Sequence, residues 1–247
     1  MKISSLPMVL AGLLLIPAIA SCSESTTDKN ATKPADNSFR IPSNTFSTAP
    51  YNKASSNKDT RIPDYETART VFWRELYQDG GRTLYCQQHF GSSYNRGINI
   101  EHVFPASWMA YSLRCGKRNQ CRVNSPEFNL IEADLHNLYP SRTDVNKARS
   151  NYQFTIIRGE QRYFGNCDFE FDERSRTAEP SPAARGRIAR SMLYMSDEYD
   201  LYLKKKQKSL LQAWDKKYPP EQEEYRRNDR VEQLQGNRNP YIDSHRQ

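Results

Sequence analysis

The stretch between residues 99 and 151 constrains the fold most, because extended and helical patterns alternate along it. It opens within the extended segment INIEHVF, which carries Glu101 and His102 side by side. A helix is predicted to begin at Asn124 or Ser125, since both are good N-caps and a proline follows. A short strand, LYP, and a helix, DVNKAR, come next. We therefore expect a domain that mixes helices and strands.

The same stretch carries the side chains that a phosphodiester hydrolase needs. Glu101 and Asn146 offer oxygen donors of the kind that Mg²⁺ prefers. The imidazole of His102 titrates near neutral pH, so it can take a proton from water. Arg118, in the segment GKRNQC, can hold a phosphate through two parallel hydrogen bonds. Arg114 and Arg122 are the alternatives for this last role.

One geometric difficulty concerns Glu101 and His102. Adjacent side chains on a strand point to opposite faces of the sheet. The two residues can share a site only where the strand ends or where its backbone is irregular.

Several sequence segments together resemble the bacterial endonuclease I family, which comprises secreted or periplasmic nucleases that cut DNA, and often RNA, with little sequence preference. The resemblance covers most of the chain after about Tyr65, with the segments in the family's order. They are EHVFPASWM, GKRNQC, EADLHNLYP, DVNKARSN, YFGNCDFEF, EPSPAARGRIARSMLYM, QAWDKKYPP and GNRNPYI.

The resemblance implies a single, mainly helical α+β domain built around a ββα-metal nuclease core. It implies that Glu101 and Asn146 bind Mg²⁺, with Mn²⁺ or Ca²⁺ as alternatives. His102 would be the general base and Arg118 would hold the scissile phosphate, so that products carry a 5′ phosphate. Three further residues match the family and are expected to support the site or the fold: Asp134, His136 and Asn137.

The N-terminal region has the pattern of an exported lipoprotein. Residues 1–21 contain one lysine and an apolar run too short to span a membrane, as in a secretory signal peptide. The segment IASC places Cys22 where a bacterial lipobox would be lipidated; the alternative is ordinary cleavage after Ala20. Residues 22–60 are polar and predict a flexible tether. Residues 61–247 form the predicted nuclease domain, in the bacterial cell envelope or secreted.

The cysteine count agrees with lipidation. Assigning Cys22 to a lipid leaves four of the five cysteines, an even number for an oxidising compartment. We predict a Cys115–Cys121 disulfide, which closes a short loop around the predicted phosphate arginine. The second predicted disulfide, Cys86–Cys167, joins two segments that flank the active region.

The charge balance favours an anionic partner. The chain carries 36 Lys and Arg against 29 Asp and Glu, a net charge of +7, and removing residues 1–21 leaves +6. A basic balance is typical of proteins that bind nucleic acid. A helix predicted to begin at Ser181 carries three arginines in its first half: Arg185, Arg187 and Arg190. These arginines either form a solvated face or contact phosphates.

Periodicity and breakers predict the remaining elements. They are a helix from about Tyr65 to Asp79, extended segments at 82–89 and 162–170, a helix around residues 210–214, and a charged helix at 221–235 that ends at Gly236.

The sequence thus predicts a lipid-anchored, metal-dependent, sequence-nonspecific endonuclease that acts as a monomer on DNA, with RNA as a further candidate substrate. The alternatives from other classes are a catalytically inactive nucleic-acid-binding surface lipoprotein and a surface interaction protein. The first is disfavoured because Glu101, His102 and Asn146 are all present.

Overall fold

The computed structural model describes residues 61–92, 97–159 and 161–246. All of them lie in the larger of the chain's two units, residues 53–247. The predicted signal peptide, the lipidation site at Cys22 and the predicted tether lie outside the described residues. Among the residues described, no helix is both long enough and apolar enough to cross a membrane.

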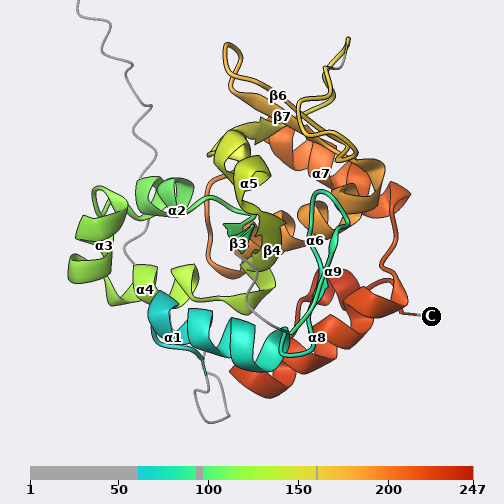
Figure 1. Cartoon of the computed structure of the whole chain (residues 1–247). Coiled ribbons are helices and arrows are strands. Elements are labelled where there is room, and N and C mark those ends of the chain that lie inside the picture. The colour runs from blue at the N-terminus through green and yellow to red at the C-terminus, as the bar shows by residue number, and fades with distance from the viewer. Residues whose placement is uncertain (1–60, 93–96, 160, 247) are drawn as a thin grey trace, which may run out of the picture. The chain divides into compact units, whose positions relative to one another are not determined.

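Two antiparallel strands lie at the centre of the domain (Figure 1). β3 (Ile98–His102) pairs with β4 (Leu138–Arg142), so that Glu101 lies opposite Tyr139. Helix α5 (Thr143–Arg149) follows β4 directly and packs on both strands. The order strand, strand, helix agrees with the expected arrangement of the core.

Short helices cover one side of this hairpin. They are α1 (Tyr65–Val71), continued by the π-helical turn η1 (Phe72–Leu76), α2 (Ala106–Leu113), α3 (Arg118–Asn124), α4 (Pro126–Glu132) and the 3₁₀ turn η2 (Leu135–Asn137). Of the two predicted N-caps of α4, Ser125 is the one used: its side chain accepts a hydrogen bond of 3.1 Å from the amide of Phe128.

The predicted extended segment at 82–89 is wrong. Only β1 (Gly81–Arg82) and β2 (His89–Phe90) are strands, and the residues between them form a turn. The turn closes through hydrogen bonds between Thr83 and Gln88, because Gln87 adopts a positive φ of 54°. This turn carries Tyr85 into the core.

The predicted strand at 162–170 begins only at Phe169. Gly165 has a φ of 64°, and a turn closes between Phe164 and Cys167 before the strand starts. A three-stranded sheet follows, in which β7 (Thr177–Pro180) pairs in parallel with β5 (Gln153–Phe154) and antiparallel with β6 (Phe169–Asp172).

The C-terminal helices agree well with the sequence pattern. They are α6 (Pro182–Glu198), α7 (Lys205–Lys217) and α8 (Gln222–Gln235); the short α9 (Pro240–Asp243) follows and was not predicted. α6 is largely buried, with Ile188, Met192 and Met195 in the main core. α8 ends at Gly236, which takes the left-handed conformation that a C-terminal glycine allows, with a φ of 84°.

Both predicted disulfides are confirmed. Cys86 pairs with Cys167, and Cys115 pairs with Cys121. The second bond joins the residues just before α3 to the middle of that helix, so it constrains the start of α3, where Arg118 lies.

Candidate active site

Glu101 lies on the face of β3 that packs against α5. Its side chain is buried, and its Oε1 accepts a hydrogen bond of 2.5 Å from the hydroxyl of Tyr85. A terminal nitrogen of Arg149, on α5, lies 3.2 Å from the same oxygen. Burial raises the pKa of the Glu101 carboxyl, and the Arg149 charge and the Tyr85 hydrogen bond oppose this shift. The carboxylate is therefore held in place by two buried partners.

Asn146 lies on the same face of α5 as Arg149, because the two residues are three positions apart on a helix. Its side-chain nitrogen donates to the carbonyl of Ile100 at 3.1 Å and to Oδ1 of Asn99 at 2.9 Å. No donor from the described residues contacts its amide oxygen. Asn146 thus reaches β3 one residue away from Glu101 and keeps an oxygen for a ligand.

His102 is the last residue of β3 and points away from Glu101. Its Nε2 lies 3.1 Å from the carbonyl oxygen of Glu132, at the end of α4. The ring of Tyr65 lies 5.0 Å from the imidazole, centroid to centroid. Burial, followed by the positive charge of Arg118, lowers the pKa of His102 to about 4. The imidazole is therefore neutral at pH 7, as a general base must be.

Arg118 approaches His102 through Glu132. The Nε of Arg118 donates to Oε1 of Glu132, and the Nε of Arg122 donates to Oε2 at 2.6 Å. The carboxylate of Glu132 is completely buried, whereas the arginine side chains are 42% and 32% exposed. The structure therefore places both Arg118 and its alternative Arg122 around Glu132, whose carbonyl oxygen contacts His102, and each arginine side chain stays partly exposed.

The predicted site residues fall into two groups on opposite sides of the end of β3. Glu101 and Asn146 lie towards α5, and His102 and Arg118 lie towards α1 and α4. Glu101 and His102 therefore point to opposite faces, as expected for neighbours on a strand, and both lie at the end of β3.

Asp134 belongs to the core behind the site. Its side chain is buried and accepts four hydrogen bonds of 2.6–2.8 Å, which satisfy both carboxylate oxygens. The donors are the hydroxyls of Tyr194 and Tyr199, the side-chain amide of Gln235 and the backbone amide of His136. This arrangement ties η2 to α6 and α8.

His136 and Asn137 are also buried. Nε2 of His136 lies 3.2 Å from the carbonyl oxygen of Asn237. The side chain of Asn137 bonds both backbone groups of Phe104, at 2.6 and 3.0 Å. Asn137 therefore holds the segment that leaves β3 directly after His102.

The structure does not favour phosphate contacts for the α6 arginines. Arg187 is 7% exposed and Arg190 is 1% exposed. Each guanidinium lies within 3.2 Å of acidic side chains: Arg185 with Glu179, Arg187 with Glu221 and Glu223, and Arg190 with Glu224 and Asp215. We therefore assign them to internal ion pairs, since their charge is compensated within the protein.

Sequence reasoning missed four residues that shape the site: Tyr65, Tyr85, Glu132 and Arg149. Arg149 had a usable signal, since it follows Asn146 by three residues on a predicted helix. The others reach the site from distant turns and helices, so no local pattern marks them.

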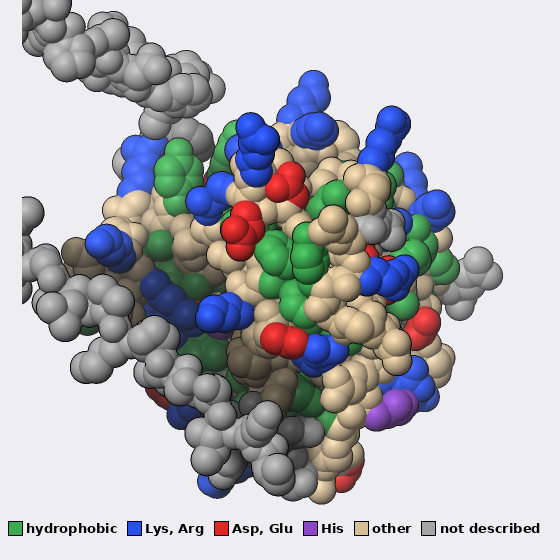
Figure 2. All heavy atoms as spheres, turned by 45° about the horizontal axis from the view of Figure 1, so that its top comes forward, with side chains coloured by type: hydrophobic (Ala, Val, Ile, Leu, Met, Phe, Trp, Pro, Cys, Tyr) green, Lys and Arg blue, Asp and Glu red, His purple; other side chains and the backbone are tan. Residues whose placement is uncertain are grey.

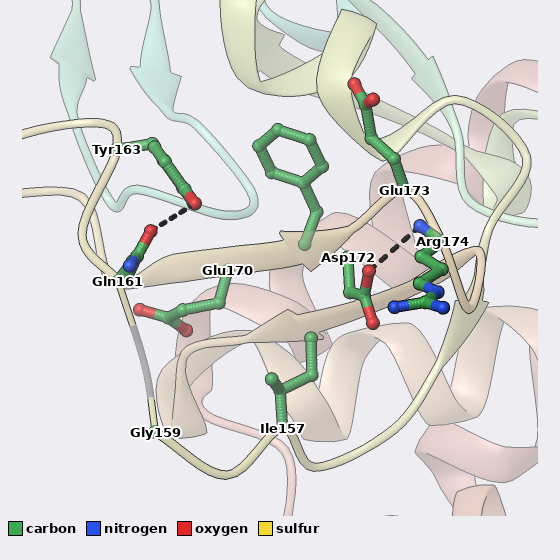
Figure 3. Close-up of a pocket in the computed structure, with 9 residues that line it drawn as sticks. Ile157, Gly159, Gln161, Tyr163, Glu170, Asp172, Glu173 and Arg174 are labelled. Carbon is green, nitrogen blue, oxygen red and sulfur yellow. Dashed lines mark hydrogen bonds between the residues drawn. The ribbon is translucent and has the colours of Figure 1, made fainter.

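A separate cavity of about 540 Å³ lies between the loop after β5 and the strand β6. Figure 3 shows Tyr163, Glu170 and Asp172 around it, and it contains none of the predicted site residues.

Within residues 61–92, 97–159 and 161–246, no cluster of three or more His, Cys, Asp or Glu has the arrangement of a metal site. This finding does not bear on the pair Glu101 and Asn146, because only one of its two members belongs to these four residue types.

Comparison with known sequences decides the family. The sequence model of the Endonuclease I family matches residues 27–246. The chain belongs to the endonuclease I family. A periplasmic deoxyribonuclease of Aeromonas hydrophila is 41% identical over 155 residues, which cover 60% of this chain and 65% of that protein. The aligned region thus spans slightly less than two thirds of that relative.

Other relatives of this endonuclease I family member carry different names. Endonuclease-1 of Buchnera aphidicola subsp. Baizongia pistaciae is 35% identical over 183 residues, covering 70% of this chain and 72% of that protein. An extracellular ribonuclease of Bacillus amyloliquefaciens is 30% identical over 182 residues, covering 65% and 57%.

Proposed function

We propose that the protein is a metal-dependent, sequence-nonspecific endonuclease that hydrolyses phosphodiester bonds in DNA, with RNA as a second substrate. The observation that carries this proposal is a neutral, oriented imidazole at His102 beside the guanidinium of Arg118. Relatives named for deoxyribonuclease, endonuclease and ribonuclease activity support it. Lys and Arg side chains are spread over the face shown in Figure 2, which suits a polyanion.

His102 is the proposed general base. Because a carbonyl can only accept a hydrogen bond, the contact with Glu132 requires Nε2 to carry the proton. The second ring nitrogen then keeps its lone pair and can take a proton from an attacking water.

Glu101 and Asn146 would hold the metal ion. Carboxylate and amide oxygens suit Mg²⁺, and two protein ligands leave room for water and phosphate oxygens. The amide oxygen of Asn146 is available because its nitrogen makes both hydrogen bonds. Oε2 of Glu101 is the oxygen that neither Tyr85 nor Arg149 uses. A bound Mg²⁺ would supply positive charge to the transition state and the leaving oxygen.

Arg118 is the proposed ligand of the scissile phosphate. It donates one N–H to Glu132, so the terminal nitrogens remain for a phosphate. Attack by water on the phosphorus with departure of the 3′ oxygen leaves a 5′ phosphate on the product.

We further propose a monomer in the periplasm or outside the cell, held to a membrane by a lipid on Cys22. The names of the Aeromonas relatives, which are periplasmic and extracellular, support export. The support for the lipid is the lipobox pattern of the sequence.

Plasmid DNA incubated with the purified protein and Mg²⁺, or with EDTA instead, tests the enzyme directly. We expect nicking and then fragmentation with Mg²⁺, and intact plasmid with EDTA. Binding without cleavage under any divalent ion would support the inactive nucleic-acid-binding alternative. Structured RNA in a parallel reaction tests the second substrate.

A further inference from the structure

Arg122 lies beside the proposed site and has no role of its own once Arg118 is assigned to the scissile phosphate. It lies four residues after Arg118, one turn along α3, so both side chains leave the same face of the helix. Its Nε lies 2.6 Å from Oε2 of Glu132 and one terminal nitrogen lies 3.1 Å from Oε1. The two arginines therefore share one carboxylate.

This sharing leaves a positive charge at the surface. Two guanidinium groups face the single, completely buried carboxylate of Glu132, so one unit of charge is not compensated within the trio. Arginine has five N–H donors, and Glu132 takes only two from Arg122. The remaining donors of Arg122 are available because its side chain is 32% exposed.

Tyr65 connects Arg122 to the proposed general base. The guanidinium carbons of Arg118 and Arg122 lie 5.3 and 5.1 Å from the centre of its ring, within cation–π distance. The same ring also lies 5.0 Å from the imidazole of His102, centroid to centroid. The positive charges of Arg118 and Arg122 thus lie around one ring. The charge of Arg118 lowers the pKa of His102 more than the charge of Arg122 does.

We propose that Arg122 is a second phosphate-binding residue, which holds the phosphate next to the one held by Arg118 on the same strand. The inference rests on the proposed nuclease function. The two side chains leave α3 about 6 Å apart, and their Nε atoms bond different oxygens of Glu132, so the two guanidinium groups present separate donors on one face. Arg118 and Arg122 would grip two neighbouring phosphates, while Glu132 and Tyr65 fix the directions of both side chains.

A neighbouring phosphate does not react, and this gives Arg122 a kinetic signature. Interactions made equally in the bound substrate and in the transition state change KM and leave kcat unchanged. A contact with the scissile phosphate strengthens in the transition state and changes kcat. Arg122→Ala should therefore raise KM, whereas Arg118→Ala should lower kcat.

The test compares Arg122→Ala with Arg226→Ala, which removes an equal charge from an exposed position on α8, away from α3 in Figure 1. Arg122→Ala should fold, because Glu132 keeps Arg118 as its partner. We expect about a tenfold rise in KM and in the Kd for duplex DNA measured in EDTA, from the loss of a charge-assisted hydrogen bond. Arg226→Ala should match the wild type.

A substrate variant makes the test specific. Oligonucleotides with one cleavable phosphate and a neutral methylphosphonate on its 5′ or its 3′ side should separate the two neighbours. One of these replacements should raise KM for the wild type about tenfold and have no further effect on Arg122→Ala.

Two results would overturn the inference: Arg122→Ala indistinguishable from Arg226→Ala, or a loss in kcat with unchanged KM. A wild-type protein that does not cut would instead refute the nuclease proposal, while the Kd measured in EDTA would still report on Arg122.

Discussion

The carbonyl oxygen of Glu132 lies 3.1 Å from Nε2 of His102, and the carboxylate of the same residue bonds Arg118 and Arg122. One residue thus orients the proposed base through its backbone and the proposed phosphate ligands through its side chain. Because that carboxylate is buried at the end of α4, its position is set by the packing of α4 and not by solvent.

The ion pair between Arg190 and Glu224 predicts a stability effect in place of a binding effect. Both side chains are 1% exposed, and two guanidinium nitrogens lie 2.6 and 2.7 Å from the carboxylate oxygens. Arg190→Ala should lower the free energy of unfolding by about 3–5 kcal/mol, because it leaves a buried charge without a partner. Urea unfolding followed by circular dichroism measures this.

The control for Arg190 is again the exposed Arg226, whose replacement by alanine should change stability by less than about 0.5 kcal/mol. The opposite outcome is an Arg190→Ala variant that is as stable as the wild type but binds DNA with a weaker salt dependence. A slope of log K against log salt that is smaller in magnitude by about 0.9 would restore the phosphate-contact interpretation.

His136 predicts that the fold weakens in mild acid. It is 1% exposed, and burial lowers its pKa to about 4, against 6.5 in an unfolded chain. Between these values the unfolded state binds more protons, so stability falls as pH falls from 6.5 to 4. The slope from this residue is about 1.4 kcal/mol per pH unit.

Unfolding measured across pH 4–7 for His136→Gln tests this, with the exposed His89→Gln as control. The pH dependence should decrease for His136→Gln and remain for His89→Gln. Equal slopes for both variants and the wild type would show that His136 is already charged in the fold.

Long periodic elements could be predicted from the sequence, and short ones could not. α6 has an apolar stripe that begins after Ser181 and Pro182, and α8 is a charged segment bounded by Pro220 and Gly236, so both positions agree with expectation. β5 has two residues and β7 has four, too few for a periodic signal. Both disulfide pairs are as predicted, although Cys86 lies in a turn and Cys167 lies before β6, and not on the expected strands.

The site could be predicted as a set of residue types but not as a geometry. Glu132 contacts His102 across 30 residues of chain, and Tyr85 reaches Glu101 from a turn with no strand pattern. Neither alternative for the α6 arginines holds, because a basic cluster on a helix has the same sequence pattern whether it faces solvent, phosphate or the acidic side chains of another helix.

The proposed metal ligands predict a linked change in metal dependence. Glu101→Gln and Asn146→Ala should each raise the Mg²⁺ concentration for half-maximal cleavage by about tenfold or more, since each removes or weakens an oxygen ligand. Titrating Mg²⁺ into cleavage reactions measures this. Glu127→Gln and Asn124→Ala, both at exposed positions, are the matched controls. An unchanged half-saturating concentration in both site variants would remove these residues from the metal site.

The central claim is that His102 activates the attacking water, and one comparison tests it most directly. Cleavage of plasmid DNA by His102→Ala is measured beside the exposed control His89→Ala, with both variants shown to be folded and to bind DNA in EDTA. The account predicts that His102→Ala loses at least about a hundredfold in rate, the scale of a lost general base, while His89→Ala keeps the wild-type rate. A folded His102→Ala variant that cuts at the wild-type rate would contradict it.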